Sequence, residues 1–457
     1  MNPTEATAQF IANTSFEQIP SPVIAKAKGC VLDCAGVMIA GSGHPATNII
    51  TEFIEEMGGR PQASIVGRGI RTSTCLAAFA NGSMAHVLDY DDTSRSMRDG
   101  HPTAPVLPTV LALGEKTGTS GKRILEAYII GSEVEMKIGS LVTPTHADRG
   151  WHTTGTLGTI GAAAAAAKIL DLDINKTGMA IGIAISEAAG VSQNFGTMTK
   201  SFHAGAAAKH GIIAALLAKE GFTSAINALE GKLGFYGIFC GDKRCELGKI
   251  SERLGNPYDF IFPGVDIKRY PCCSSAHCAI DAVLQLAQKH KFSSEKIENI
   301  RCGVSYKVPT VLIYPFPKTD LEAKSSMQFC LAVALVDKKV TVAEFTDSRL
   351  RDPRIQNLMK RTEMYVHPDL QTKESLAHEF TLVAVRLKDG TEYSLKIRKG
   401  QGSMSTPLKE EEIVSKYKQC AQSLLNEENI ERSIKLIRNL ENLDDIKELM
   451  RILSGLN

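Results

Sequence analysis

Residues 86–102 hold the densest group of ionisable side chains in the sequence. Residues 86–93 read HVLDYDDT, and a loop with two arginines then leads to Gly100-His101-Pro102. Imidazole titrates near neutral pH and the flanking residues restrict the backbone, so we expect His101 to act as a catalytic acid or base. Asp89 could fix the tautomer of a histidine and Thr93 could hydrogen-bond a substrate oxygen, or the two could exchange these roles. The alternative for His101 is a loop histidine with a structural hydrogen bond.

A second candidate segment contains the single tryptophan of the chain. Residues 150–152 read GWH, and three threonines and an alanine-rich stretch follow. Hydroxyl groups and free backbone amides at a helix start can bind a carboxylate, and His152 would be a second catalytic acid or base. The alternative is ordinary N-capping by Thr153, Thr154 or Thr156.

Two further segments place cations beside histidines. Lys200 and His203 lie in TMTKSFHAG, just before an alanine-rich stretch, and Lys268 and His277 lie in VDIKRYPCCSSAH. A lysine at a helix start opposes the helix dipole, so its presence there suggests a function. Such cations suit a di- or tricarboxylic acid, and we expect Lys200, Lys268 and His277 to bind the substrate.

No metal and no organic cofactor is expected. Asp89, Asp91 and Asp92 lack the spacing and the additional oxygen ligands of a calcium loop. The adjacent Cys272 and Cys273 seldom give tetrahedral zinc geometry, and no second CxxC lies nearby, so Cys272 is expected to be a buried packing residue. Glycine motifs for dinucleotides or nucleoside phosphates are absent from the sequence.

Helices must position the first three segments. Small and apolar residues dominate residues 21–229, and glycines within this region would permit close contact between packed helices. The pattern predicts helices over Val106–Glu115, Arg123–Ile138, Gly155–Leu170 and Ala204–Lys219.

A smaller α+β unit follows Pro263. Strands are predicted at Asn299–Val308, Phe380–Leu387 and Tyr393–Ile397, with a hairpin turn before the last, and helices at Ser275–His290 and Ser325–Val336. The tail, Lys409–Leu453, has helical spacing and is expected to pack on the first domain. The expected fold is mainly α, with an all-α helical domain from residues 1–262 and 400–457 and an α+β lid domain from residues 263–399.

Composition restricts the class of protein. Lys and Arg number 52 and Asp and Glu 50, so the formal charge of +2 gives no general attraction to nucleic acid or to an anionic membrane. No apolar run is long enough to span a bilayer, and the N-terminus lacks the pattern of a signal peptide. Eleven scattered cysteines favour reduced thiols. These features predict a cytoplasmic protein with a small-molecule partner.

Five segments, in this order and spacing, resemble the MmgE/PrpD family along nearly the whole chain: NGSMAHVLDYDDT, GHPTAPVLP, GWHTTGTLGTIGAAAAAAKILDLD, TKSFHAGAAAKHGIIAALLAKEGFTS and KRYPCCSSAH. The resemblance implies a homodimer with an active site between a helical domain and a lid domain. It places the motif positions of the family on Asp89, Thr93, His101, His152, Lys200 and Lys268.

The resemblance also implies a lyase that needs no cofactor and acts on a small polycarboxylate. Elimination of water, as in 2-methylcitrate dehydratase, is the reaction expected first. Decarboxylation of cis-aconitate to itaconate and epimerisation of iminodisuccinate are the alternatives, since all three need cations for carboxylates and a placed acid or base. A helical interaction protein without catalysis is the alternative of another class.

Overall fold

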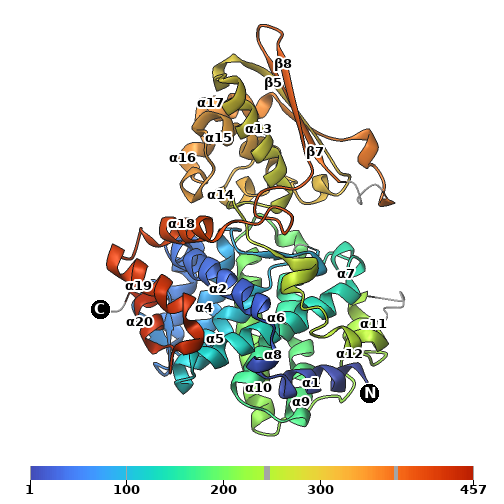
Figure 1. Cartoon of the computed structure of the whole chain (residues 1–457), viewed down its shortest axis with the longest axis vertical. Helices are drawn as coiled ribbons and strands as arrows, with labels where there is room; N and C mark the ends of the chain where they lie inside the picture. Colours follow the sequence, from blue (N-terminus) through green and yellow to red (C-terminus); the bar gives the residue numbers. More distant parts are fainter. Residues whose placement is uncertain (1, 99, 241–246, 375–378, 456–457) are drawn as a thin grey trace.

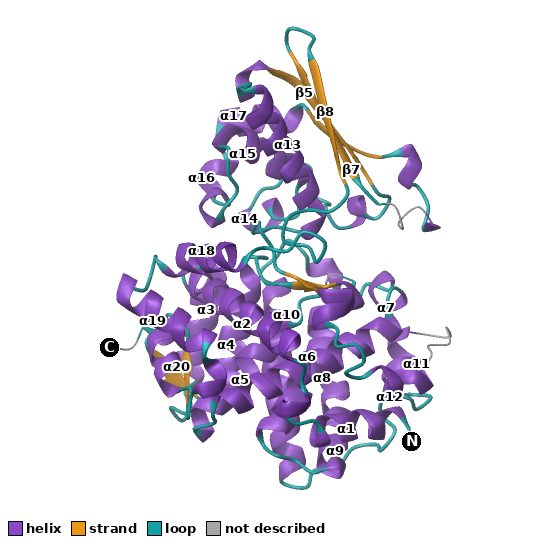
Figure 2. Cartoon of the chain, in the orientation of Figure 1, coloured by secondary structure: helices purple, strands orange, loops and turns teal. Residues whose placement is uncertain are grey.

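The computed structural model of the protein describes residues 2–98, 100–240, 247–374 and 379–455. The chain forms two lobes (Figure 1), each with its own cluster of buried apolar side chains. We call them the helical lobe and the sheet lobe, and Figure 2 shows how the strands concentrate in the second. The fold is mainly α with a smaller sheet-containing part, which confirms the predicted fold class.

The helical lobe contains the four helices that the sequence pattern predicted, each slightly longer than expected. These are α5 (Thr103–Thr117), α6 (Gly121–Val142), α8 (Thr153–Ile169) and α10 (Thr199–Lys219). The lobe also contains α1 (Pro3–Asn13), α2 (Ser21–Ser42), α3 (Pro45–Met57), α4 (Thr74–Val87), α7 (Thr145–Asp148), α9 (Ile174–Glu187), α11 (Phe235–Cys240) and α12 (Ile250–Arg253).

Glycines allow the central helices to touch backbone to backbone. Helix α10 packs against α4 and α8. A Cβ atom on Gly205 would lie 2.2 Å from the carbonyl oxygen of Phe79, and one on Gly211 would lie 2.4 Å from the Cβ of Ala162. Any larger residue would force these helices apart, so the predicted close contact is confirmed. This packing fixes the start of α10 beside the end of α4.

The sheet lobe is built on four strands in the order β6-β5-β7-β8. Strand β5 pairs parallel with β6 and antiparallel with β7, and β7 and β8 form the predicted hairpin, in which Gly390 adopts a φ of +88°. Strand β6 was not predicted, because in TEMYV only Thr362 is buried. The strands are β5 (Ile297–Val304), β6 (Thr362–Val366), β7 (Thr381–Leu387) and β8 (Glu392–Ile397).

Helices pack on the sheet and complete the second apolar cluster. The two predicted helices are present as α13 (His277–His290) and α15 (Met327–Asp337). The shorter helices are α14 (Asp320–Ala323), α16 (Asp347–Leu350) and α17 (Pro353–Lys360).

The C-terminal tail returns to the helical lobe, as predicted. Helices α18 (Glu410–Ala421) and α19 (Glu427–Arg438) pack against α2, and α20 (Lys447–Ser454) contacts α5. Figure 1 shows these three helices, in red, on the same side of the lobe as α2, in blue, although most of the chain separates them in sequence. We propose that the two lobes are the domains expected at residues 1–262 with 400–457 and at residues 263–399. Among the described residues, no helix is both long and apolar enough to cross a membrane.

Candidate active site

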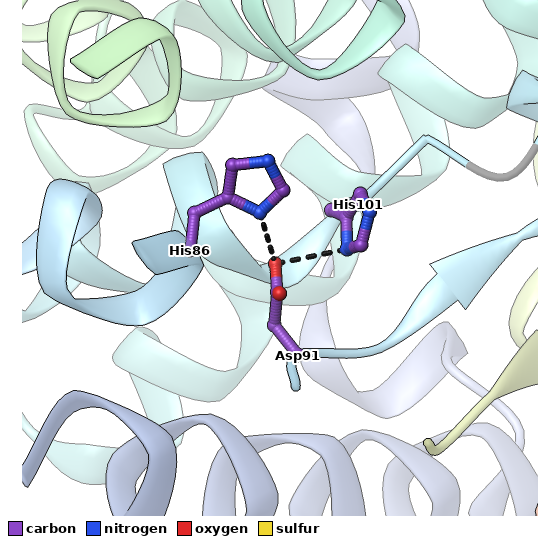
Figure 3. A group of neighbouring side chains, drawn as sticks. All are labelled: His86, Asp91 and His101. Atoms are coloured by element: carbon purple, nitrogen blue, oxygen red, sulfur yellow. Dashed lines mark hydrogen bonds and ion pairs between the residues drawn. The ribbon is translucent and has the colours of Figure 1, made fainter. Parts of the chain in front are cut away.

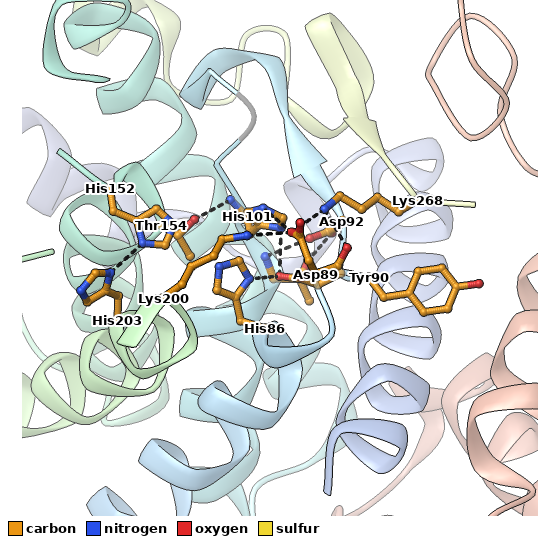
Figure 4. A network of polar contacts seen from close by, with 12 residues as sticks. His86, Asp89, Tyr90, Asp92, His101, His152, Thr154, Lys200, His203 and Lys268 are labelled. Atoms are coloured by element: carbon orange, nitrogen blue, oxygen red, sulfur yellow. Dashed lines mark hydrogen bonds and ion pairs between the residues drawn. The ribbon is translucent and has the colours of Figure 1, made fainter. Parts of the chain in front are cut away.

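Asp89 lies at the centre of a buried polar network just beyond the end of α4 (Figure 4). Its φ of +51° turns the chain sharply after Leu88, a conformation that aspartate tolerates better than most residues. The Oδ1 atom of Asp89 lies 2.7 Å from Nζ of Lys268 and 2.9 Å from Nζ of Lys200. Three predicted site residues, from separate parts of the sequence, therefore meet at one carboxylate oxygen.

The charges of this group stabilise one another. Burial opposes ionisation of Asp89, but the two ammonium groups outweigh it and hold the pKa of Asp89 well below its usual range. Burial likewise opposes the charge of Lys268, yet Asp89 raises the pKa of Lys268 above its usual value. The carboxylate and the Lys268 ammonium are thus both charged at neutral pH.

Asp91 links two imidazoles through one oxygen (Figure 3). Its Oδ2 lies 2.9 Å from Nδ1 of His86 and 3.0 Å from Nδ1 of His101. The rings of His86 and His101 meet edge to face with centroids 4.4 Å apart, and Nε2 of His101 lies 3.7 Å from Asp89 Oδ1. A carboxylate at Nδ1 holds an imidazole in the tautomer that leaves Nε2 for a reacting group.

Burial keeps these imidazoles neutral in the free protein. It lowers the pKa of His86 to about 4 and also lowers the pKa of His101, with Asp91 offsetting part of each shift. For Asp91, the two imidazoles outweigh the effect of burial and hold its pKa well below the usual range. Nε2 of His86 is buried and has no hydrogen-bond partner among the described residues, so it is available to a ligand.

His152 pairs with a histidine that the sequence analysis did not place in the site. Its Nδ1 lies 2.9 Å from Nδ1 of His203 on α10, and its ring stacks on His86 with centroids 5.5 Å apart. Burial and the neighbouring cationic groups hold the pKa of His152 well below its usual range and lower that of His203 to about 4. Two neutral rings can form this contact when one Nδ1 carries a proton and donates it to the unprotonated Nδ1 of the other ring.

The threonines at the start of α8 do not cap the helix. His152 is the N-cap residue, and no side-chain capping bond is present. Oγ1 of Thr154 instead accepts a 3.1 Å hydrogen bond from the backbone amide of His101. Oγ1 of Thr156 contacts the His146 ring at 2.7 Å. The alternative of ordinary N-capping by these threonines is therefore wrong, and Thr154 fixes the position of the His101 loop.

A small pocket with a cavity volume of about 20 Å³ opens beside Asp89 between the two lobes. His101, His152 and Lys268 lie behind its wall, in contact with lining residues. The lining residues from the helical lobe are His86, Val87, Asp89, Gly196, Thr197, Lys200 and Ser201, and those from the sheet lobe are Leu321, Lys324 and Ser325.

Two further predicted binding residues, like Lys268, lie outside the lining of this pocket. Thr93 is buried in β3 (Thr93–Ser94), where its backbone pairs with Asp266 of β4 (Val265–Asp266). His277 begins α13, and its Nε2 lies 3.3 Å from the carbonyl oxygen of Cys272. Cys272 is fully buried, as predicted. Binding roles for Thr93 and His277 remain predictions.

Lys416 of α18 supports the network from behind. Its Nζ donates 2.8 Å hydrogen bonds to the carbonyl oxygens of Tyr90 and Lys268, and it pairs with the buried Asp33 at 2.6 Å. One C-terminal side chain thus ties the loop that carries Asp89 to the segment that carries Lys268. Sequence reasoning missed this residue because the tail had no motif.

Four residues of the site carried no individual prediction of a role: His86, Asp91, His203 and Lys324. The first two stand in the predicted HVLDYDDT segment, so their density with Asp89 was a usable signal. Lys324 lies outside the segments that the sequence analysis singled out, and only the fold brings it to the pocket.

One group of donor atoms could hold a metal ion within the described ranges. His86, Asp91 and His101 each offer one atom, and these atoms lie within 4.8 Å of one another. Asp91 Oδ2 already contacts both imidazoles, so a metal would have to replace those contacts. The expectation of metal-free chemistry stays a prediction.

Comparison with known proteins gives two family matches. Residues 5–248 match the MmgE/PrpD N-terminal domain, and residues 270–442 match the MmgE/PrpD C-terminal domain. Together the two matches span both lobes and contain each of the residues predicted for the site except Lys268, which lies between the two matched ranges.

Curated relatives match most or nearly all of the chain. The cis-aconitate decarboxylase of Homo sapiens is 29% identical over 99% of this chain and 94% of its own length. That of Aspergillus terreus is 26% identical over 99% and 96%. The 2-methylcitrate dehydratase of Escherichia coli K12 is 23% identical over 80% of this chain and 78% of its own length.

Proposed function

The chain belongs to the MmgE/PrpD family, and on this basis we propose that it is a carboxy-lyase that removes carbon dioxide from a small unsaturated tricarboxylate such as cis-aconitate. The relatives named above are lyases, decarboxylases and dehydratases, that act on polycarboxylates. The observation that carries the proposal is the convergence of lysines and imidazoles on one buried pocket.

The reaction needs fixed positive charge and one proton. Loss of carbon dioxide from the CH₂-bound carboxylate of cis-aconitate leaves an allylic carbanion, whose charge spreads onto the conjugated carboxylate. Protonation at the far allylic carbon gives itaconate, so one trianion and one proton yield one dianion and one carbon dioxide. Ammonium groups near the conjugated carboxylate stabilise the charge that develops in the transition state.

Lys200 is placed for this electrostatic role. It lines the pocket and is partly exposed, whereas Lys268 is held against Asp89 behind the wall. In the free protein Asp89 balances part of their charge. A substrate carboxylate would share these cations with Asp89 and would meet groups that are already oriented, which limits the reorganisation cost of the reaction.

The His86–Asp91–His101 group is suited to deliver the proton. His86 lines the pocket with a free Nε2, and Asp91 orients both rings. A bound trianion adds negative charge that raises the pKa of nearby imidazoles, so substrate and proton are taken up together. His101 is the predicted acid, Asp91 orients it, and His152 would support His86 by stacking.

Decarboxylation is placed before dehydration because of the extent of the similarity. Decarboxylase relatives cover 99% of this chain, and the dehydratases cover 80% with lower identity. Dehydration of 2-methylcitrate is the second candidate, because a neutral His101 with Nδ1 held by Asp91 can also remove a proton beside a carboxylate. The epimerase and the non-catalytic alternatives have no comparable support.

The test is a proton NMR time course of purified protein with cis-aconitate, citrate, 2-methylcitrate and iminodisuccinate. Itaconate as the product supports the proposal. An olefinic product from 2-methylcitrate would instead establish a hydro-lyase, and a change at the stereocentre of iminodisuccinate an epimerase. No turnover of any substrate would contradict the proposal and favour an interaction protein.

We also propose that the protein is a cytoplasmic homodimer. Large apolar side chains remain exposed on α10 and beyond it, among them Phe202, Leu217, Phe222 and Ile226. Exposed apolar side chains of this size favour association with a partner, and a second copy could cover them. The described cysteines other than Cys240 are free thiols, in accord with a reducing compartment. Light scattering during gel filtration tests the dimer, and fractionation of the source cells tests the location.

A further inference from the structure

Lys324 is the cation that the sheet lobe contributes to the pocket. It follows α14, its backbone amide donates to the carbonyl oxygen of Asp320, and its own carbonyl oxygen accepts from the amide of Cys273. The residue is 3% exposed, yet it lines the pocket together with Asp89 and Lys200. Lys324 thus contributes a buried side chain to the sheet-lobe lining of the pocket.

The ammonium group of Lys324 has little compensation. Its hydrogen bond to the carbonyl oxygen of Pro271 is 3.4 Å long, and the ring centroid of Phe345 lies 4.5 Å away. Within the described part of the chain it forms no ion pair, whereas Lys200 and Lys268 both reach Asp89. Burial lowers the pKa of Lys324 to about 8 although Asp320 and Asp89, which are too far away to form an ion pair, oppose the shift, and Lys324 is mainly charged at pH 7. A buried charge without a partner costs stability, so folding alone gives no reason to keep it.

A ligand would supply the missing partner. Lys200 and Lys268 already share the carboxylate of Asp89, and they approach the pocket from the helical lobe. A ligand carboxylate on the opposite side would meet Lys324 and would bridge the two lobes. A dicarboxylate bound with both its carboxylates at the helical-lobe cations would leave Lys324 unpaired, whereas a tricarboxylate has a third carboxylate to offer it.

We propose that Lys324 binds one carboxylate of the substrate and makes the site selective for tricarboxylates over dicarboxylates. This inference rests on the proposed function in taking a polycarboxylate as the ligand. It adds a substrate-binding residue in the sheet lobe. The physical reason for this role is that the fold leaves the charge of Lys324 without an ion pair.

The test uses a ligand that cannot react. Propane-1,2,3-tricarboxylate and glutarate differ by the central carboxylate, and titration calorimetry measures their binding to wild type, Lys324→Met, Lys324→Arg and Lys318→Met. Lys318 is exposed in the same lobe and is the matched control. We expect Lys324→Met to weaken binding of the tricarboxylate about tenfold or more and to change glutarate binding by less than about threefold, since one charged contact is lost. Lys324→Arg should retain part of the selectivity.

Stability gives an independent measurement. Because Lys324 is charged and unpaired, Lys324→Met should raise the midpoint of thermal unfolding at pH 7 while it weakens binding. A lower midpoint would mean a structural role and would overturn the inference. Unchanged tricarboxylate affinity, equal weakening for both ligands, or no binding to wild type would also overturn it. If wild type binds the tricarboxylate selectively through Lys324 but turns over no substrate, only the proposed reaction fails.

Discussion

Nζ of Lys268 lies 2.7 Å from Oδ1 of Asp89, and both residues are buried. The pair joins the end of α4 to the segment that leads into the sheet lobe. Lys200 shares the same oxygen, so a single carboxylate balances two ammonium groups. This arrangement makes Asp89 necessary to the fold and the site at once.

We expect Asp89→Asn to destabilise the protein by about 3–5 kcal/mol, because the change leaves two cations without their partner. Urea unfolding followed by circular dichroism measures the loss. Asp148→Asn removes a carboxylate that pairs with Arg98 at the surface and serves as control, with an expected change below about 1 kcal/mol. Equal effects of the two substitutions would contradict the assignment.

Asp91→Asn is expected to lower kcat about 10²–10⁴-fold and to leave KM within about threefold, because the proton-transfer rings lose their orienting group without loss of a cation. Steady-state kinetics with cis-aconitate measures both constants. His86→Gln and His101→Gln identify the ring that carries the proton, and His290→Gln in the sheet lobe is the control. A rise in KM at constant kcat would assign Asp91 to binding instead.

The pH dependence of kcat/KM separates the two candidate reactions. The pKa of His101 lies below its usual value in the free protein. A decarboxylase needs the protonated ring, so kcat/KM should fall as pH rises through that lowered pKa. A dehydratase needs the neutral ring, and its kcat/KM should fall as pH decreases through the same pKa. Profiles measured from pH 8 down to the lowest pH at which the protein stays folded show which limb is present, and a profile that is flat over this whole range would exclude His101 from both roles.

Asp92 makes stability depend on pH. Burial raises its pKa from the usual 3.8 to about 7. Between these values the folded state binds more protons than the unfolded chain, so this contribution to stability decreases as pH rises. At pH 8 we expect Asp92→Asn to be more stable than wild type by on the order of 1–3 kcal/mol, since the amide can still bond Thr103. Melting curves from pH 5 to 8 test this. The exposed Asp444→Asn should show no such trend, and a parallel shift in both variants would refute the interpretation.

Metal removal should leave activity unchanged. The one donor group found within the described residues has its carboxylate oxygen in contact with both imidazoles. We expect full activity after dialysis against a chelator, with less than stoichiometric metal by mass spectrometry. Loss of activity that zinc restores would instead assign a metal to His86, Asp91 and His101.

Local physical chemistry made much of this fold readable from the sequence. The helices over Arg123–Ile138 and Gly155–Leu170 and the hairpin before Tyr393 follow from residue type and spacing within one element, and the structure contains them. The same is true of the dense ionisable segment around Asp89, because a short loop after a helix keeps its side chains together.

Tertiary structure decided which distant groups meet. Spacing does not say that Lys200 and Lys268 share an oxygen of Asp89, that Asp91 holds both His86 and His101, or that Lys324 faces them from the other lobe. Those contacts depend on how glycine-lined helices approach and on how one lobe sits above the other. Lys324, which lies outside any recognisable sequence motif, becomes a candidate binding residue only because folding buries its ammonium group without an ion pair.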